Sequence, residues 1–137
     1  MPRKTPISEL MTTRVQTLDV GAKPSEARRV LSEQRVHHVP IVDDGVLVGI
    51  VSSRDLVRIL RSTPAAGSES VDEVLDRSGD VARVMSTELV TLRSDASVED
   101  AIERIAAGAV HSVLVLDADR RLVGIVTDTD LLDYLCE

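Results

Sequence analysis

A ten-residue stretch occurs twice in this chain. Residues 47–56 read Leu-Val-Gly-Ile-Val-Ser-Ser-Arg-Asp-Leu, and residues 122–131 read Leu-Val-Gly-Ile-Val-Thr-Asp-Thr-Asp-Leu. In both, an apolar run with an internal glycine leads to a hydroxyl residue, and an aspartate follows three positions later. Further pairs keep nearly the same spacing, since His37 recurs as His111 and Met11 as Met85. The chain is therefore an internal duplication, and we expect each copy to form a similar unit.

Both copies show the same order of predicted elements, β-α-β-β-α, after a short helical lead-in. Residues 39–42 and 113–116 are continuous apolar runs, typical of strands buried on both faces. Pro24 suits a first helical position, and Ser97 with Asp100 forms an N-cap pair. The expected elements are lead-in helices at 6–11 and 80–85, strands at 15–18, 39–42, 46–51, 89–92, 113–116 and 122–126, and helices at 24–33, 53–60, 98–107 and 128–135.

One copy of roughly 55 residues has too little interior to be stable alone. We therefore expect an α/β (α+β) fold in which two tandem β-α-β-β-α repeats pack with pseudo-two-fold symmetry and leave two equivalent clefts between them. The expected domains are repeat 1 with its N-terminal lead-in at residues 1–61, a small-residue linker at 62–79, and repeat 2 at 80–137. Residues 71–77 of the linker are expected to form a helical turn.

Composition excludes several classes of partner. A net charge of −7 and a pI near 4.9 argue against a broad phosphate-backbone interface. Aromatic residues make up only 1% of the chain, which argues against single-stranded nucleic-acid binding by stacking. No apolar run approaches about 18 residues, so we expect no membrane span. The start of the chain, residues 1–5, is basic without a following apolar signal core and is expected to be a short flexible lead-in.

Cysteine content bears on the compartment. Cys136 is the only cysteine, so no internal disulfide can form. This is compatible with a reducing compartment, and we expect a cytoplasmic location.

The double β-α-β-β-α plan ending in Gly-apolar-x-(Ser/Thr)-x-x-Asp resembles the cystathionine-β-synthase (CBS) domain pair, also called a Bateman module. The resemblance covers nearly the whole chain, and both copies keep the signature. It implies a regulatory module that binds an adenosine-containing ligand, either AMP, ADP, ATP or S-adenosylmethionine, in the clefts between the repeats. It also implies that no cofactor is required and that occupancy is signalled to a partner protein, whose identity the sequence does not give.

Each signature ends in a hydroxyl residue and an aspartate, Ser52 with Asp55 and Thr127 with Asp130. As a capping pair, the hydroxyl accepts from the N3 amide and the carboxylate accepts from the cap amide. As a ligand site, a helix N-terminus suits phosphate, and an aspartate there can accept two hydrogen bonds from a ribose diol. The two roles are compatible. By resemblance, the aspartates contact the ribose and the hydroxyls lie near the phosphate.

Two further sets are candidates for ligand contacts by resemblance. His37, His111 and Arg35 occupy positions that often face phosphates in the family, although an imidazole hydrogen-bonded at the start of a strand is an equal alternative. The histidine spacing fits no metal-ligand pattern, so we expect no metal site. The base is expected near Val39 and Pro40 and near Thr13 and Thr87, with plain core and capping roles as the alternative.

The glycine inside each signature, Gly49 or Gly124, has two explanations. Glycine in a strand interior marks a bulge or a close backbone approach, or it permits helix–strand packing without a ligand.

The copies differ in charge around the signature. The first has Arg54 inside its signature and Arg35 nearby, whereas the second has Asp128 inside its signature and Ala109 at the position that matches Arg35. Because like charge near an anion lowers affinity, Asp128 is expected to disfavour a polyphosphate at the second site. We therefore expect two unequal sites.

Sequence motifs of catalysis are missing, since the chain has no P-loop, no Gly-x-Ser-x-Gly and no paired cysteines. We expect a sensor and not an enzyme. A structural dimerisation module without a physiological small-molecule ligand is the main alternative. In either case the leucine-rich helices at 53–60 and 128–135 are expected to bury themselves in a homodimer.

Overall fold

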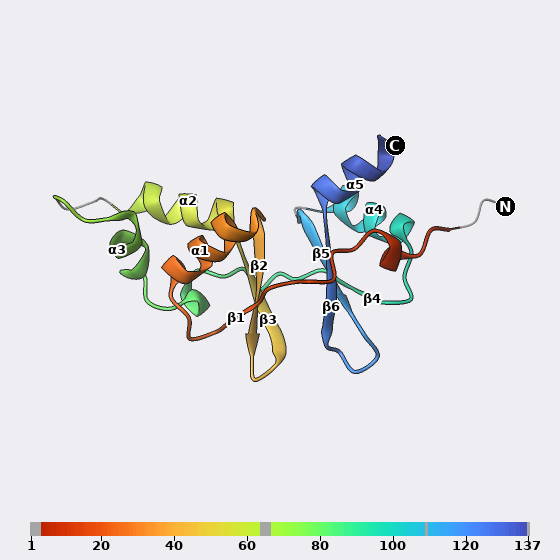
Figure 1. The fold of residues 1–137 in the computed structure, drawn as a ribbon, viewed down its shortest axis with the longest axis horizontal. Coiled ribbons are helices and arrows are strands. Elements are labelled where there is room, and N and C mark those ends of the chain that lie inside the picture. Colours follow the sequence, from red (N-terminus) through yellow and green to blue (C-terminus); the bar gives the residue numbers. More distant parts are fainter. Residues whose placement is uncertain (1–3, 64–66, 109, 137) are drawn as a thin grey trace. The chain divides into compact units, whose positions relative to one another are not determined.

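The computed structural model describes residues 4–63, 67–108 and 110–136. The chain forms two compact units, unit 1 with Met1–Val15 and Leu89–Glu137, and unit 2 with Gln16–Glu88. Each unit contains one three-stranded sheet with helices packed on it (Figure 1), which confirms the expected α/β class. Ala109, residues 64–66 of the expected linker and residues 1–3 of the expected lead-in lie outside the described residues.

In unit 2 the strand order is β1-β2-β3, with β1 parallel to β2 and β3 antiparallel to β2. Val39, Ile41 and Val51 are fully buried and form the core with residues of the covering helices. The strand predicted at 15–18 is shorter and begins later than expected, since β1 starts only at Leu18. The elements of unit 2 are β1 (Leu18–Asp19), α1 (Pro24–Gln34), β2 (His38–Asp43), β3 (Val46–Ser52), α2 (Ser53–Ser62) and α3 (Val71–Asp76).

Unit 1 repeats this plan with the order β4-β5-β6 and the same parallel and antiparallel pairings. Its core contains Val98, Val115 and Val126, all fully buried. The predicted cap of α4 is confirmed: Ser97 N donates to Asp100 at 2.9 Å and Asp100 N donates to Ser97 Oγ at 3.2 Å. Both bonds lower the pKa of Asp100, and the bond from the Ser97 backbone has the larger effect. The elements are β4 (Thr91–Arg93), α4 (Val98–Ala107), β5 (Ser112–Leu116), β6 (Leu122–Thr127) and α5 (Asp128–Leu135).

The lead-in helices predicted at 6–11 and 80–85 are single turns of 3₁₀ helix, η1 (Ile7–Glu9) and η2 (Val81–Arg83), and are thus shorter than expected. Each lead-in packs on the repeat that it does not precede in the sequence. Thr12 pairs with Ile125 of β6 through two backbone hydrogen bonds of 2.9 and 3.0 Å. Ser86 pairs in the same way with Ile50 of β3, at 2.8 and 3.0 Å. Unit 1 therefore combines the first lead-in with the second repeat, and unit 2 combines the second lead-in with the first repeat.

This exchange explains the glycine in each signature. A Cβ on Gly49 would overlap the side chain of Met85 and lie 3.1 Å from the carbonyl oxygen of Ser86. A Cβ on Gly124 would lie only 2.5 Å from Sδ of Met11. Close approach of the lead-in is therefore the reason for glycine at both positions.

Helix α3 holds the linker against α1. Arg28 Nε donates to Asp72 Oδ1 at 2.5 Å, which lowers the pKa of Asp72 and raises that of Arg28. Asp76 accepts hydrogen bonds from the backbone N–H of Ser25 at 2.9 Å and from its hydroxyl at 2.7 Å. Because the N-cap residue of α1 makes no side-chain cap, Asp76 supplies an acceptor at this helix end from another element. Leu75 of α3 is fully buried and joins the core of unit 2.

None of the described helices combines the length and apolar character that crossing a membrane requires.

The exchanged lead-ins predict a specific coupling between mutations. Gly49→Ala should destabilise the protein by about 1–3 kcal/mol, because the new methyl group overlaps a packed side chain. Met85→Ala removes that side chain, so the double mutant should recover about 0.5–3 kcal/mol of coupling energy in denaturant unfolding. The matched control, Gly49→Ala with Met11→Ala, should be additive within about 0.5 kcal/mol. Coupling to Met11 in place of Met85 would contradict the exchange.

Candidate functional site

The junction between β3 and α2 carries the first signature. Ser52 is the N-cap of α2, and its hydroxyl accepts from Asp55 N at 3.1 Å. The carboxylate of Asp55 accepts in return from Ser52 N at 2.8 Å. Arg58, one turn along the helix, donates to the other carboxylate oxygen at 3.5 Å. The predicted capping pair is thus present, and it holds the carboxylate at the start of the helix.

The junction between β6 and α5 repeats this arrangement. Thr127 Oγ1 accepts from Asp130 N at 3.2 Å, and Asp130 Oδ2 accepts from Thr127 N at 2.9 Å. Both aspartates are half-buried in the first turn of a helix, just after a strand with three consecutive buried residues. The duplication therefore gives each unit one fixed carboxylate beside a helix N-terminus.

A histidine precedes the middle strand in each unit and lies beside the signature, but the two have different partners. In unit 2, His37 Nδ1 lies 3.3 Å from the hydroxyl of Ser53, and Ser53 N donates to the His37 carbonyl at 2.9 Å. In unit 1, His111 Nδ1 lies 3.1 Å from Asp128 Oδ2. Both contacts fit the alternative of a histidine hydrogen-bonded at the start of a strand, and both rings are exposed.

Asp128 has a second contact that sequence reasoning missed. Its Oδ1 accepts from the backbone N–H of Thr129 at 2.9 Å, in the first turn of α5. A carboxylate of the chain itself therefore occupies an amide that an anionic ligand would use at a helix N-terminus. The presence of Asp128 in the signature was visible in the sequence, but its pairing with His111 was not, because no local pattern joins residues so far apart.

The threonines expected near the base belong to the exchanged lead-ins. Thr13 follows the segment that pairs with β6, so it belongs to the same unit as Thr127 and Asp130. Thr87 follows the segment that pairs with β3 and belongs with Ser52 and Asp55. Both threonines are exposed. Each candidate site therefore draws its residues from two separate segments of the chain.

The remaining candidates differ in exposure. Arg35 and Arg54 are exposed, and Arg35 ends α1 in the left-handed conformation with φ of 53°. Val39 is fully buried in the core of unit 2, and Pro40 beside it is buried too. This placement fits the core alternative for Val39, and its role as a flank for a base stays a prediction.

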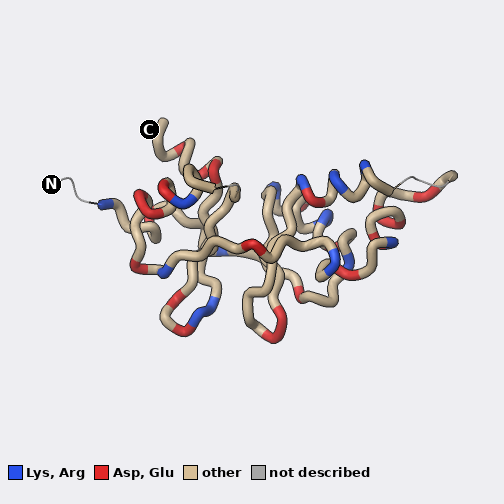
Figure 2. The backbone as a smooth tube through the Cα atoms, turned by 180° about the vertical axis from the view of Figure 1, so that it is seen from behind, with Lys and Arg blue, Asp and Glu red and all other residues tan. Residues whose placement is uncertain are grey.

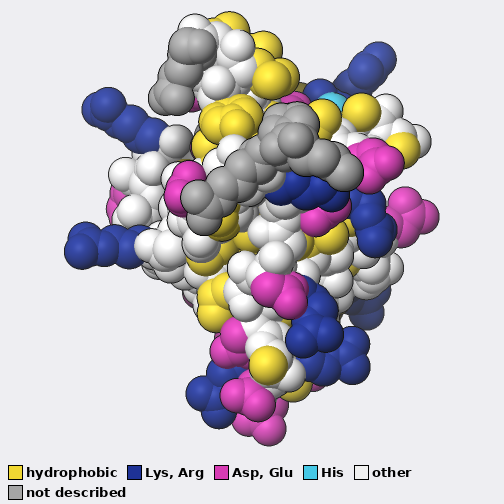
Figure 3. All heavy atoms as spheres, turned by 90° about the vertical axis from the view of Figure 1, so that its right-hand side faces the viewer, with side chains coloured by type: hydrophobic (Ala, Val, Ile, Leu, Met, Phe, Trp, Pro, Cys, Tyr) yellow, Lys and Arg dark blue, Asp and Glu magenta, His cyan; other side chains and the backbone are white. Residues whose placement is uncertain are grey.

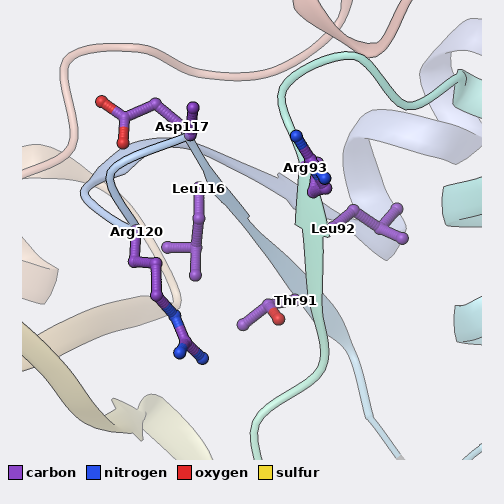
Figure 4. A pocket seen from close by; sticks show the side chains of 7 residues that line it. Thr91, Leu92, Arg93, Leu116, Asp117 and Arg120 are labelled. Atoms are coloured by element: carbon purple, nitrogen blue, oxygen red, sulfur yellow. The ribbon is translucent and has the colours of Figure 1, made fainter.

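A shallow hollow of about 340 Å³ lies at the opposite end of the sheet of unit 1 (Figure 4). It is lined by β4 and by the turn that joins β5 to β6, with Leu116 as an apolar wall and Arg93, Arg120 and Asp117 around it. Asp117 Oδ1 accepts backbone N–H groups of its own turn, at 2.9 Å each. No residue that we predicted for ligand contact lines this hollow.

Within the described ranges, no group of three or more His, Cys, Asp or Glu side chains is placed to hold a metal ion.

Comparison with known proteins decides the family. The model of the CBS domain matches residues 7–62 and again residues 80–137. The chain belongs to the CBS domain family. The CBS domain-containing protein YhcV of Bacillus subtilis is 34% identical over 125 residues, which cover 91% of this chain and 81% of YhcV.

Other relatives carry the CBS pair as a small part of a longer protein. A homoserine O-acetyltransferase of Methanohalobium evestigatum is 31% identical over 126 residues, covering 91% of this chain. This chain spans only 23% of that enzyme. Activities of such relatives therefore do not describe the CBS pair itself.

Solved structures share the fold. The CBS domain pair of protein MJ0100, in complex with 5′-methylthioadenosine and S-adenosyl-L-methionine, superposes with a TM-score of 0.82 at 24% identity and covers 98% of both chains. The structure of CBSX2 in complex with AMP gives a TM-score of 0.76 at 23% identity, with 96% of each chain covered. The architecture of two repeated units is thus that of a CBS pair.

The signature aspartates should contribute to stability before any ligand is considered. Asp130→Ala removes the acceptor for Thr127 N and should cost about 1 kcal/mol in the free energy of unfolding. Asp130→Asn keeps an acceptor oxygen in place and should cost less. Thermal or urea unfolding of both variants measures the difference. Equal stability of wild type and both variants would show that the carboxylate does not cap α5.

Proposed function

We propose that this protein is a ligand-sensing regulatory module that binds an adenosine-containing compound at the strand–helix junction of each unit. The observation that carries the proposal is the pair of matching junctions, each with a carboxylate held by a capping box and a histidine beside it. The ligands bound by MJ0100 and CBSX2 support AMP and S-adenosylmethionine as candidate ligands. ADP and ATP are related candidates.

The fixed carboxylate suits a ribose diol. An ionised carboxylate offers about four acceptor positions, and the cap amide takes one of them. The capping box removes the rotational freedom of the aspartate, so little entropy is lost when a diol donates to it. In this proposal Asp55 and Asp130 accept from the ribose hydroxyls, while Ser52, Thr127 and the neighbouring basic residues lie toward the 5′ substituent. The exposed Thr13 and Thr87 lie toward the base.

The output of such a sensor is a change in a partner protein. A ligand that binds one conformation of the module more tightly shifts the population toward it, and a partner that reads this conformation receives the signal. We propose a homodimer as the signalling form, with an effector protein still to be identified and without catalysis by the module. A cytoplasmic location stays a prediction.

A structural dimerisation module is the second candidate. It is favoured by large exposed side chains on the signature helices: Val57, Leu132 and Leu135 are 62–63% exposed. Ligand binding separates the two candidates, because a purely structural module should not respond to any nucleotide.

Binding of an adenosyl ligand should depend on one aspartate per unit. Isothermal titration with AMP, ADP, ATP and S-adenosylmethionine should identify at least one ligand for the wild type. Asp55→Ala and Asp130→Ala should each weaken one site by about 10- to 150-fold, since a hydrogen bond to a charged group contributes roughly 1.5–3 kcal/mol. Ligand that binds equally to wild type and both variants would contradict the ribose assignment. Product analysis after incubation tests for catalysis.

The two sites should differ toward phosphate. Asp128 already occupies His111 and the Thr129 amide, so AMP should bind the unit 1 site more weakly than the unit 2 site. Asp128→Ser places the residue type of Ser53 there and should improve the weaker site by roughly 1 kcal/mol, about fivefold, and by less at high salt. The control ligand is adenosine, whose affinity should not change. Two sites of equal affinity that the substitution leaves unchanged would show that Asp128 does not affect ligand binding.

A further inference from the structure

The outer stripes of α2 and α5 carry opposite charge. On α2, helical spacing places Arg54, Val57, Arg58 and Arg61 on one exposed stripe, while Leu56 faces the core. On α5, the same positions are Thr129, Leu132, Asp133 and Cys136, also exposed, while Leu131 faces the core. The backbones repeat one another, but the charge has changed sign.

The difference extends over the whole helices. Helix α2 has three arginines and one aspartate, whereas α5 has three aspartates and no lysine or arginine. Figure 2 shows this as blue segments along α2 and red segments along α5. The two helices therefore have net charges of opposite sign beside their exposed apolar side chains.

Both helices also expose large apolar side chains beside their charged ones. Val57 is 62% and Leu60 38% exposed on α2, and Leu132 is 62% and Leu135 63% exposed on α5. In Figure 3 hydrophobic side chains gather near the C-terminal helix at the top of the view. An apolar centre flanked by charge is the usual composition of a protein–protein interface.

We propose that in the homodimer α2 of one copy packs on α5 of the other copy, and not α2 on α2 or α5 on α5. This inference rests on the proposed homodimer and names its pairing. Unlike pairing brings Arg58 and Arg61 toward the Asp133 stripe and buries valine and leucine side chains between them. Like pairing would set three arginines against three arginines, which an interface avoids because uncompensated like charges oppose association. The partner of each stripe is a second copy of this chain, because every chain carries one basic stripe on α2 and one acidic stripe on α5.

Charge reversal tests the pairing with opposite outcomes for the two arrangements. Asp133→Arg and the double variant Arg58→Asp/Arg61→Asp each turn attraction into repulsion in unlike pairing. Sedimentation or light scattering should show the dimer dissociation constant of each variant raised by about tenfold or more. In like pairing each change only exchanges one pair of like charges for another, so the dimers would be as tight as wild type, which would overturn the inference.

Mixing the two variants tests whether complementary charge restores the interface that each variant alone has lost. In the mixed dimer each α2 meets an α5 of opposite sign, so a tight heterodimer should form although neither variant dimerises well alone. Glu103→Arg on the exposed face of α4 makes the same change in charge as Asp133→Arg and should leave the dissociation constant unchanged. Failure of the mixture to associate better than its components would overturn the pairing.

The experiment separates this inference from the proposed function. A wild type that stays monomeric in the micromolar range overturns both the homodimer and its pairing. Titration of Asp133→Arg with the nucleotide panel measures ligand binding independently of dimerisation, since Asp133 takes no part in the signature contacts. Nucleotide binding that persists in a monomeric variant then supports the sensor and the pairing together.

Discussion

The contact of each lead-in with a signature strand is the constraint on which both sites depend. The backbone of Ser86 pairs with Ile50, and the Met85 side chain covers the glycine next to it, leaving no room for a Cβ. Thr12, Met11 and Gly124 repeat the contact in unit 1. These contacts fix the edge of the strand that ends at the capping box. The glycine of the signature is therefore required by packing within the protein, while the hydroxyl and aspartate after it remain available to a ligand.

Local signals explain what could be read from the sequence. The bounds of α4 and α5 agree with prediction because a hydroxyl–aspartate pair marks the start of each helix. The buried strands were recognisable as short apolar runs between turns. The exchange of the lead-ins could not be read in this way. Met11 and Met85 follow equivalent segments of a duplicated sequence, so either methionine satisfies the same local pattern opposite either glycine.

Most of the contacts that sequence reasoning missed join residues far apart in the chain. Asp72 and Asp76 lie in the segment predicted as a linker, and they pair with Arg28 and Ser25 of α1. Asp128 looked like a charge that would repel an anion, yet it is hydrogen-bonded to His111. Such partners have no fixed spacing, so residue type alone indicates that a partner is needed and not which one it is. The consequence for the ligand is nevertheless similar, because a paired carboxylate still occupies donors that a phosphate would use.

The two duplicated units share one backbone plan but differ in the charges of their side chains. The charges of α5 differ from those of α2 at two separate places. Asp128 turns toward His111 at the start of the helix, where the proposed ligand binds, whereas Asp133 lies on the outer stripe. Because the two residues face different surroundings, ligand preference and dimer pairing can vary independently. In the proposed dimer, unlike helices give the two proposed ligand sites different preferences and still give each copy one complementary surface, which two identical repeats could not do.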